Sequence, residues 1–135
     1  MIRKIMLTII VATTFGSGCK ANKSDNEAPN VVFIVIDDFG FNRQGTAEIL
    51  RINRPLTAAV LPFRPNSVKD ANLAAQAGLE VILHQPLEPM NPATNPGVGA
   101  IDTTMEQAEI KATLVKNLDS LDNVSGINHH MGSKA

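Results

Sequence analysis

Apolar segments separated by amphipathic or polar stretches dominate the chain after about residue 30. Residues 31–36 are six consecutive apolar residues, mostly β-branched, which is typical of a strand buried on both faces of a parallel sheet. Residues 56–61 and 80–84 predict two further strands, and a segment beginning at Ser125 predicts a fourth.

The segments between these strands carry helical patterns. Residues 44–52 predict a short helix. A second helix can be capped by Asn66 or Ser67 and ends at Gly78. The apolar stripe of this second helix is Val68, Ala71 and Ala75. After a loop at 85–102, Thr103 and Glu106 have the spacing of a capping box. The stripe of the third helix is Met105, Ala108, Ala112, Val115 and Leu118.

Alternating strands and helices predict a parallel α/β architecture. A closed α/β barrel takes ~200 residues or more, and the chain has 135. The pattern therefore predicts either a small open sheet or part of a barrel.

The first eighteen residues have the layout of a secretory signal. Arg3 and Lys4 form a basic start, residues 5–15 are apolar apart from threonines, and small residues lead to the single cysteine, Cys19. The apolar part is too short for a spanning helix of ~20 residues. Because the layout resembles a bacterial lipoprotein signal, we expect residues 1–18 to stand outside the fold and Cys19 to be lipidated. Cleavage without a lipid and an uncleaved cytoplasmic segment are the alternatives.

The lipoprotein interpretation also predicts the organisation and location of the protein. Residues 19–29 are polar and predict a flexible tether, followed by one domain at 30–135. We expect an exported protein of the cell envelope or periplasm, attached to the membrane by a lipid anchor at Cys19.

Charge argues against nucleic acid as a partner. The chain has 12 Lys and Arg against 13 Asp and Glu, and without Arg3 and Lys4 its net charge is about −3 with histidine neutral. It has no basic run and no Trp or Tyr, whereas nucleic-acid binding uses a clustered positive field and stacking rings. A single cysteine excludes an intrachain disulfide. No pattern indicates the oligomeric state.

Candidate catalytic chemistry lies where the predicted strands end. Asp37 and Asp38 follow the first strand, at the end where parallel sheets place ligands and chemistry. Adjacent strand residues point to opposite faces, so the two carboxylates are expected to do different work, one as metal ligand and one as base. A helix cap or turn is the alternative for this pair.

Histidines follow two later strands. His84 ends the third strand and is followed by Glu88, and His129 and His130 lie in the fourth segment. A carboxylate with two imidazoles is a common ligand set for catalytic zinc, with an open position for water. A lone histidine is more often hydrogen-bonded within a core, but convergence at one end of successive strands favours a metal site.

Four segments together resemble the divergent polysaccharide deacetylase family, relatives of metal-dependent carbohydrate deacetylases. They are residues 35–40 (VIDDFG), 55–62 (PLTAAVLP), 78–89 (GLEVILHQPLEP) and 126–133 (GINHHMGS). The resemblance covers essentially all of residues 31–133. It implies a distorted (β/α) barrel with a divalent-metal site at the strand C-termini, so the expected fold is a partial barrel of this type, with parallel strands and flanking helices.

The resemblance also implies roles for individual residues. By position, Asp37 is the catalytic base, and the metal ligands are Asp38, His84 and His130. Glu88 stands where the wider group has a second histidine and is a possible further ligand. His129 replaces what resembles an Asn in the motif. Zinc is the implied metal, and the implied reaction is hydrolysis of N-acetyl groups on a polysaccharide.

The same sequence is compatible with two other functions. The scaffold could serve a non-catalytic, carbohydrate-binding or structural protein of the envelope, or the chain could be an inactive fragment. The acid that protonates the leaving amine belongs to a later motif in such enzymes, and none follows Ser133 here. We therefore expect a C-terminally incomplete domain that is marginally stable and inactive alone.

Overall fold

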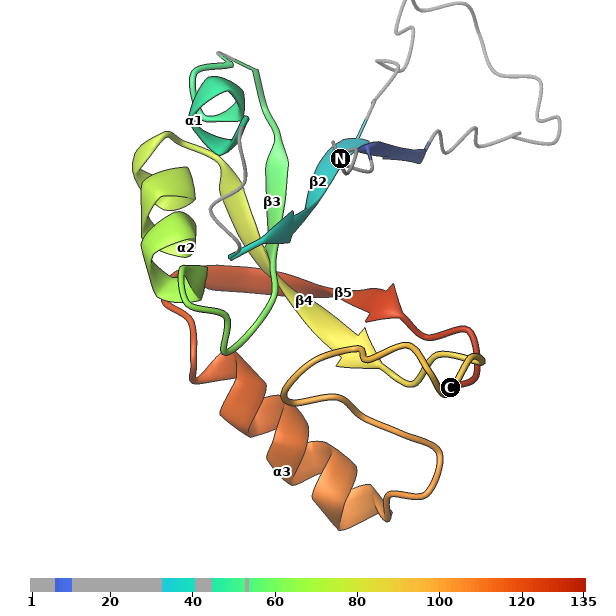
Figure 1. Cartoon of the computed structure of the whole chain (residues 1–135). Helices are drawn as coiled ribbons and strands as arrows, with labels where there is room; N and C mark the ends of the chain where they lie inside the picture. Colours follow the sequence, from blue (N-terminus) through green and yellow to red (C-terminus); the bar gives the residue numbers. More distant parts are fainter. Residues whose placement is uncertain (1–6, 11–32, 41–44, 53) are drawn as a thin grey trace, which may run out of the picture.

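A five-stranded sheet in the order β1-β2-β3-β4-β5 forms the centre of the structure (Figure 1). This computed structural model describes residues 7–10, 33–40, 45–52 and 54–135. Four of its strands are parallel neighbours: β2 (Phe33–Phe39), β3 (Thr57–Val60), β4 (Glu80–Leu87) and β5 (Val124–Met131). The helices α1 (Thr46–Ile49), α2 (Ser67–Gln76) and α3 (Gln107–Leu118) lie between them in sequence. The predicted parallel α/β fold is confirmed, and among the described residues the sheet is open.

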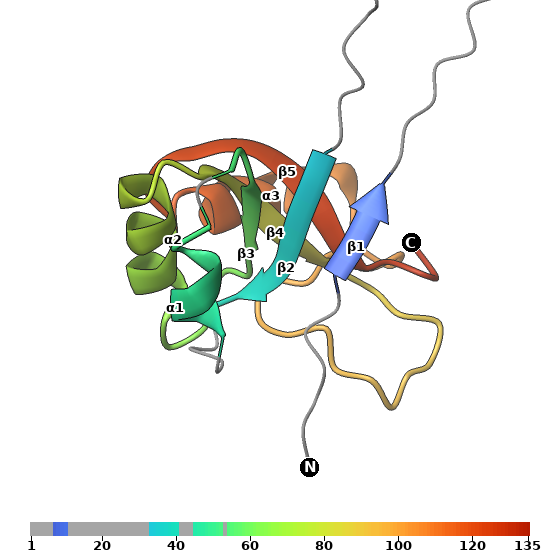
Figure 2. The same cartoon turned by 90° about the horizontal axis from the view of Figure 1, so that it is seen from above.

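The remaining strand, β1 (Leu7–Ile10), comes from the segment expected to stand outside the fold. It pairs antiparallel with β2 and lies on the outer side of that strand (Figure 2). A short apolar segment can pair in this way because an edge strand offers a row of unpaired backbone groups. The signal peptide itself stays a prediction, and Cys19 and the tether at 19–29 lie outside the described residues.

The hydrophobic core lies around the central strands. Residues 81–86 of β4 are all buried, because β4 is flanked by strands on both sides and contacted by α2 and α3. α2 also packs against β2 and β3. Burying such side chains contributes ~25 cal/mol per Å² of apolar surface. The buried apolar residues of the core are Ile36, Phe39, Leu56, Ala58, Val60, Ala71, Ala74, Leu79, Val81, Leu83 and Leu121.

The buried face of α2 differs from the predicted stripe. Val68 is 47% exposed, whereas Ser67 and Asp70 are buried beside Ala71. Asp70 accepts a hydrogen bond from the backbone N–H of Gly40, 3.0 Å away, and the Ser67 hydroxyl donates to the Leu61 carbonyl. The polar side chains face inward because they satisfy the backbone of the loops that follow β2 and β3.

The strand β4 is longer than predicted. Residues 85–87 were expected to begin a loop, but they continue β4, and Gln85 is buried. Its side-chain amide donates to the Gly99 carbonyl at 3.0 Å and accepts from Asn117 at 2.7 Å. A polar residue can continue a buried strand here because its hydrogen-bonding groups are paired.

The start of α3 also differs from the prediction. The helix begins after Glu106, whose backbone N–H donates to the Glu109 carboxylate at 2.9 Å. Thr103 was expected to form the capping box with Glu106. Instead, its hydroxyl and backbone N–H both donate to Glu88, so the box forms three residues later.

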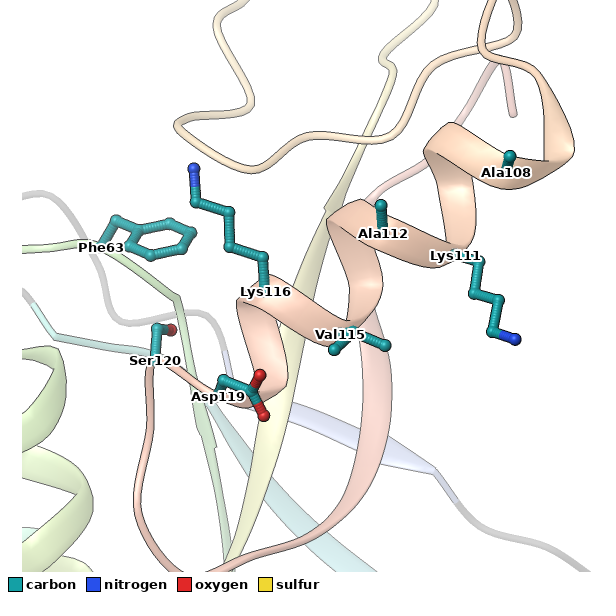
Figure 3. Close-up of a pocket in the computed structure, with 8 residues that line it drawn as sticks. All are labelled: Phe63, Ala108, Lys111, Ala112, Val115, Lys116, Asp119 and Ser120. Atoms are coloured by element: carbon teal, nitrogen blue, oxygen red, sulfur yellow. The ribbon is translucent and has the colours of Figure 1, made fainter.

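An exposed groove runs along α3 and includes three members of the predicted apolar stripe, Ala108, Ala112 and Val115, whereas Leu118 packs against the core. Val115 is 47% exposed, and the buried residue of the helix is Asn117. Figure 3 shows the side chains of this groove, which we call the α3 groove: Phe63, Ala108, Lys111, Ala112, Val115, Lys116, Asp119 and Ser120. In the described parts of the chain, no helix is both long and apolar enough to cross a membrane.

From the inward orientation of Asp70 on α2 we predict an effect on stability. Asp70→Ala leaves the Gly40 N–H buried without its acceptor, so we expect it to lower the free energy of unfolding by ~1–3 kcal/mol. Val68→Ala, two residues away on the exposed side, should change it by less than ~0.5 kcal/mol. Urea unfolding followed by circular dichroism measures both. Equal losses for the two variants would contradict this orientation of α2.

Candidate metal centre

The strand β2 departs from regular pairing where its two aspartates lie. Its register with β3 shifts between Ile36 and Phe39, so Asp37 and Asp38 together stand opposite a single residue of β3. This is the pattern of a β-bulge, which bends a strand and re-aims its side chains. Asp38 has a φ of 65°, in the left-handed region that non-glycine residues seldom adopt.

The bulge brings both carboxylates to one imidazole. Asp37 Oδ1 lies 3.9 Å from His84 Nδ1, and Asp38 Oδ1 lies 3.8 Å from His84 Nε2. The expectation that the two aspartates point to opposite faces is therefore wrong, because the left-handed residue interrupts the alternation of the strand. The pair does not cap a helix either, since α1 begins later, at Thr46.

The backbone after the bulge is held by α2. Gly40 has a φ of 110° and donates its N–H to Asp70 at 3.0 Å. A Cβ at this position would lie 2.9 Å from Ser67 Oγ, so glycine is required on two grounds. Sequence reasoning missed Asp70 as a supporting residue. It lies beside Ala71 on the side of the helix that the predicted stripe left polar, so the pattern gave no signal that it would be buried.

The two histidine ligands predicted from the sequence come from adjacent parallel strands. β3 ends at Val60, which pairs with Leu83, so His84 lies one residue beyond the paired part of β3. On β5, His130 lies two residues after Asn128, the register partner of His84. Alternate residues of a strand share a face, so Asn128 and His130 are on the same side.

His129, between them, lies on the opposite and exposed side of β5. Its Nδ1 contacts the Met131 carbonyl at 3.2 Å. The structure therefore groups His130, and not His129, with the aspartates.

Asp38, His84 and His130 form a group whose donor atoms could hold a metal ion. Asp38 Oδ1 lies 3.8 Å from His84 Nε2 and 3.3 Å from His130 Nδ1, and the two ring nitrogens are 3.1 Å apart. Donors bound to a tetrahedral ion at about 2.0–2.1 Å lie about 3.3 Å from one another. The spacing and chemistry of these donors therefore fit a divalent metal such as zinc.

The electrostatics of the group favour a neutral His130. Burial lowers the pKa of this imidazole, and the nearby His84 lowers it further, while Asp38 acts in the opposite direction. A metal binds the deprotonated nitrogen of a neutral imidazole, so the environment favours the ligating form.

Glu88, the possible further ligand, is held elsewhere by three hydrogen bonds. Its carboxylate accepts from the Lys134 ammonium at 2.6 Å and from the hydroxyl and backbone N–H of Thr103 at 2.8 and 3.1 Å. These bonds, the one from Lys134 first, lower the pKa of Glu88 to about 2. The structure groups Asp38, His84 and His130 without Glu88. Through its hydrogen bonds to Thr103 and Lys134, Glu88 instead connects the loop after β4 to the residues after β5.

Two further side chains stand at the edge of the group. Asp37, the candidate base, accepts a hydrogen bond from the Asn128 side-chain amide at 3.1 Å. The carbonyl oxygen of the same amide lies 2.7 Å from His84 Nδ1. Asn128 had no assigned role in the sequence analysis, although it stands in the motif at 126–133.

Most of the described chain matches the sequence profile of a known family. The profile of the family described as divergent polysaccharide deacetylase matches residues 34–135. This region contains every residue of the candidate metal centre.

Two curated proteins are similar to this chain, and both are uncharacterized. YibQ of Escherichia coli K12 is 32% identical over 101 residues, which cover 75% of this chain and 31% of YibQ. A protein of Haemophilus influenzae is 27% identical over 108 residues, which cover 80% of this chain and 38% of the relative. The chain thus spans about a third of the length of the curated relatives it matches.

A solved structure shares the fold. The crystal structure of uncharacterized protein ATU2773 from Agrobacterium tumefaciens C58 matches with a TM-score of 0.64 and 23% sequence identity. The match covers 73% of this chain and 41% of that chain. It supports the parallel α/β arrangement described above.

The grouping of the candidate ligands predicts which substitutions affect metal binding. With zinc as the probe ion, His84→Ala and Asp38→Ala should each lower bound metal well below one ion per chain, because each removes a donor atom. Glu88→Gln should bind as much zinc as the parent. Metal content after dialysis, measured by atomic emission, tests this. Lys134→Gln is the matched control for loss of the Glu88 ion pair, and a deficit in Glu88→Gln that this control lacks would place Glu88 in the centre.

Proposed function

The chain belongs to the divergent polysaccharide deacetylase family, and on that premise we propose that it is a metal-dependent hydrolase domain acting on N-acetylated polysaccharide. The observation that carries the proposal is the grouping of Asp38, His84 and His130 beside Asp37 at the ends of parallel strands. In such folds, the ends of the strands are where catalytic residues collect.

Three side chains would hold the metal in this proposal. They are Asp38 through Oδ1, His84 through Nε2 and His130 through Nδ1, the atoms that face one another. We propose zinc because two imidazoles and one carboxylate are a usual set for catalytic zinc. A bound divalent ion would polarise the amide carbonyl of the substrate and lower the pKa of a coordinated water.

Asp37 would act as the general base. Its carboxylate lies next to the ligands and its orientation is fixed by the hydrogen bond from Asn128. It would accept a proton from the water that attacks the acetyl carbon. The C–N bond then breaks, the proton that Asp37 took from the water passes to the nitrogen directly or through solvent, and the products are acetate and a free amine on the sugar.

One substitution tests whether Asp37 acts as the base and not as a metal ligand. Asp37→Asn removes the proton acceptor but no donor atom of the metal group, so zinc content should stay at the parental level. Acetate release from an N-acetylated glycan should fall by ~10²–10⁴-fold. Asp119→Asn, in the α3 groove, is the control and should retain full turnover.

The same assay decides between the proposal and its alternative. Zinc-loaded protein that binds the glycan but releases no acetate, in this chain and in a full-length relative, would favour a non-catalytic carbohydrate-binding or structural protein of the envelope. Unchanged turnover in Asp37→Asn would remove Asp37 as base.

We also propose that the protein is exported and anchored in the cell envelope by a lipid on Cys19. The support is the order of basic residues, apolar segment and small residues before this cysteine. Cleavage before Cys19 would remove β1, so that β2 becomes the edge of the sheet in the mature domain at 30–135, which follows the tether at 19–29.

The anchor is tested by substitution of the cysteine. In a bacterial host, the parent should sediment with membranes and incorporate labelled palmitate, whereas Cys19→Ala should lose both properties. Ser17→Ala, which keeps a small residue before the cysteine, is the matched control. A Cys19→Ala protein that stays as firmly in the membrane as the parent would contradict lipidation.

A further inference from the structure

Asn128 connects the candidate base to a candidate metal ligand. Its side-chain N–H group donates to Asp37 Oδ1 at 3.1 Å, and its carbonyl oxygen lies 2.7 Å from His84 Nδ1. Asp37 Oδ1 and His84 Nδ1 are themselves 3.9 Å apart, beyond hydrogen-bond distance. The amide therefore mediates the contact between the two side chains.

The chemistry of these groups determines which atom donates and which accepts in each of the two hydrogen bonds of Asn128. An ionised carboxylate only accepts hydrogen bonds, so the amide NH₂ of Asn128 must face Asp37. Its carbonyl oxygen then faces His84, and an amide oxygen also only accepts. The hydrogen on His84 must consequently be on Nδ1, because two acceptors cannot bond each other.

This tautomer leaves the lone pair of His84 on Nε2. That atom is the one that lies 3.8 Å from Asp38 Oδ1 and 3.1 Å from His130 Nδ1, inside the group of candidate ligands. In the other tautomer, Nε2 would carry a hydrogen pointing at the other donors and could not bind a metal.

The position of Asn128 suits this task. It is the direct register partner of His84 across the parallel pair β4–β5, and His84 is only 3% exposed. The sheet therefore sets the distance between the amide and the imidazole. The interaction follows the general pattern in which a second hydrogen bond orients a ligating histidine.

We propose that Asn128 is a positioning residue that holds His84 in the Nδ1–H tautomer, with Nε2 presented to the metal, while the same amide orients Asp37. The inference rests on the proposed metal site but not on the proposed reaction. The hydrogen on His84 can be located in the metal-free chain, where neither zinc affinity nor acetate release affects the answer.

The experiment is long-range ¹H–¹⁵N correlation NMR on the metal-free chain at a pH where the imidazoles are neutral. The chain has only three histidines, and signals that vanish in His84→Gln assign His84. The parent should show the Nδ1–H pattern. Asn128→Leu, which removes both hydrogen bonds at similar volume, should lose this preference. Asn128→Asp still offers an acceptor to Nδ1–H and should keep it, when it is measured at a pH high enough that the new carboxylate leaves the His84 ring neutral.

Zinc affinity is the second measurement. Asn128→Leu should weaken zinc binding by ~10–100-fold, the usual effect of removing a partner that orients a metal ligand. Ser125→Ala, on the same strand but bonded to Glu80 and the Val81 carbonyl, is the matched control and should bind like the parent.

The outcomes distinguish this inference from the proposed function. A parent with its hydrogen on Nε2 of His84, or an Asn128→Leu variant that keeps the Nδ1–H pattern, overturns the inference and leaves the proposed hydrolase intact. If Asn128→Leu does not fold, the Asn128→Asp variant is used instead. Loss of the Nδ1–H pattern of His84 in Asn128→Asp also overturns the inference. A parent with the expected tautomer but no zinc binding refutes the metal site instead.

Discussion

The left-handed backbone at Asp38 is the constraint on which the candidate metal centre depends. A regular strand would send one of two adjacent carboxylates to each face of the sheet, and His84 could then contact only one of them. Such a backbone costs ~1–3 kcal/mol and persists where its surroundings hold it. Here the pairing of Phe39 with Val60 resumes after the bulge, and Asp70 holds the N–H of Gly40. The strained residue therefore lies at the site where the proposed function uses both carboxylates.

A neutral amide between Asp37 and His84 keeps their proposed roles separate. A direct bond between a carboxylate and an imidazole would join the base to the ligand, and the carboxylate would favour the charged form of the ring. Asn128 donates to Asp37 and accepts from His84, so it links the two side chains without adding a charge. Burial favours a neutral His130, the form of the ring whose nitrogen can bind a metal. Asp37 stays outside the group of candidate ligands.

Buried polar groups also decide how α3 lies on the sheet. Asn117 donates to Gln85 and to the Gly99 carbonyl, each at 2.7 Å. Leaving such partners unpaired in the interior costs ~1–3 kcal/mol each, and turning Val115 inward would carry Asn117 away from both. The helix therefore buries an amide, and its alanines and Val115 line the exposed α3 groove.

The sequence by itself determined the parallel α/β class, the order of the four parallel strands and three helices along the chain, and three residues that meet at the centre, but not the pairing of β1 with β2. The class and the order follow from local regularities, because runs of β-branched residues favour buried strands and parallel strands align their carboxyl ends. The choice of Asp38, His84 and His130 within those strand ends followed from the resemblance to the family. Only the tertiary structure decided that Asp37 and Asp38 face the same imidazole, that Glu88 bonds elsewhere, and that Asp70 and Asn117 face inward. Each of these depends on a hydrogen-bond partner at least fifteen residues away in sequence or on a bulge set by pairing with β3, and periodicity along one segment contains no information about either.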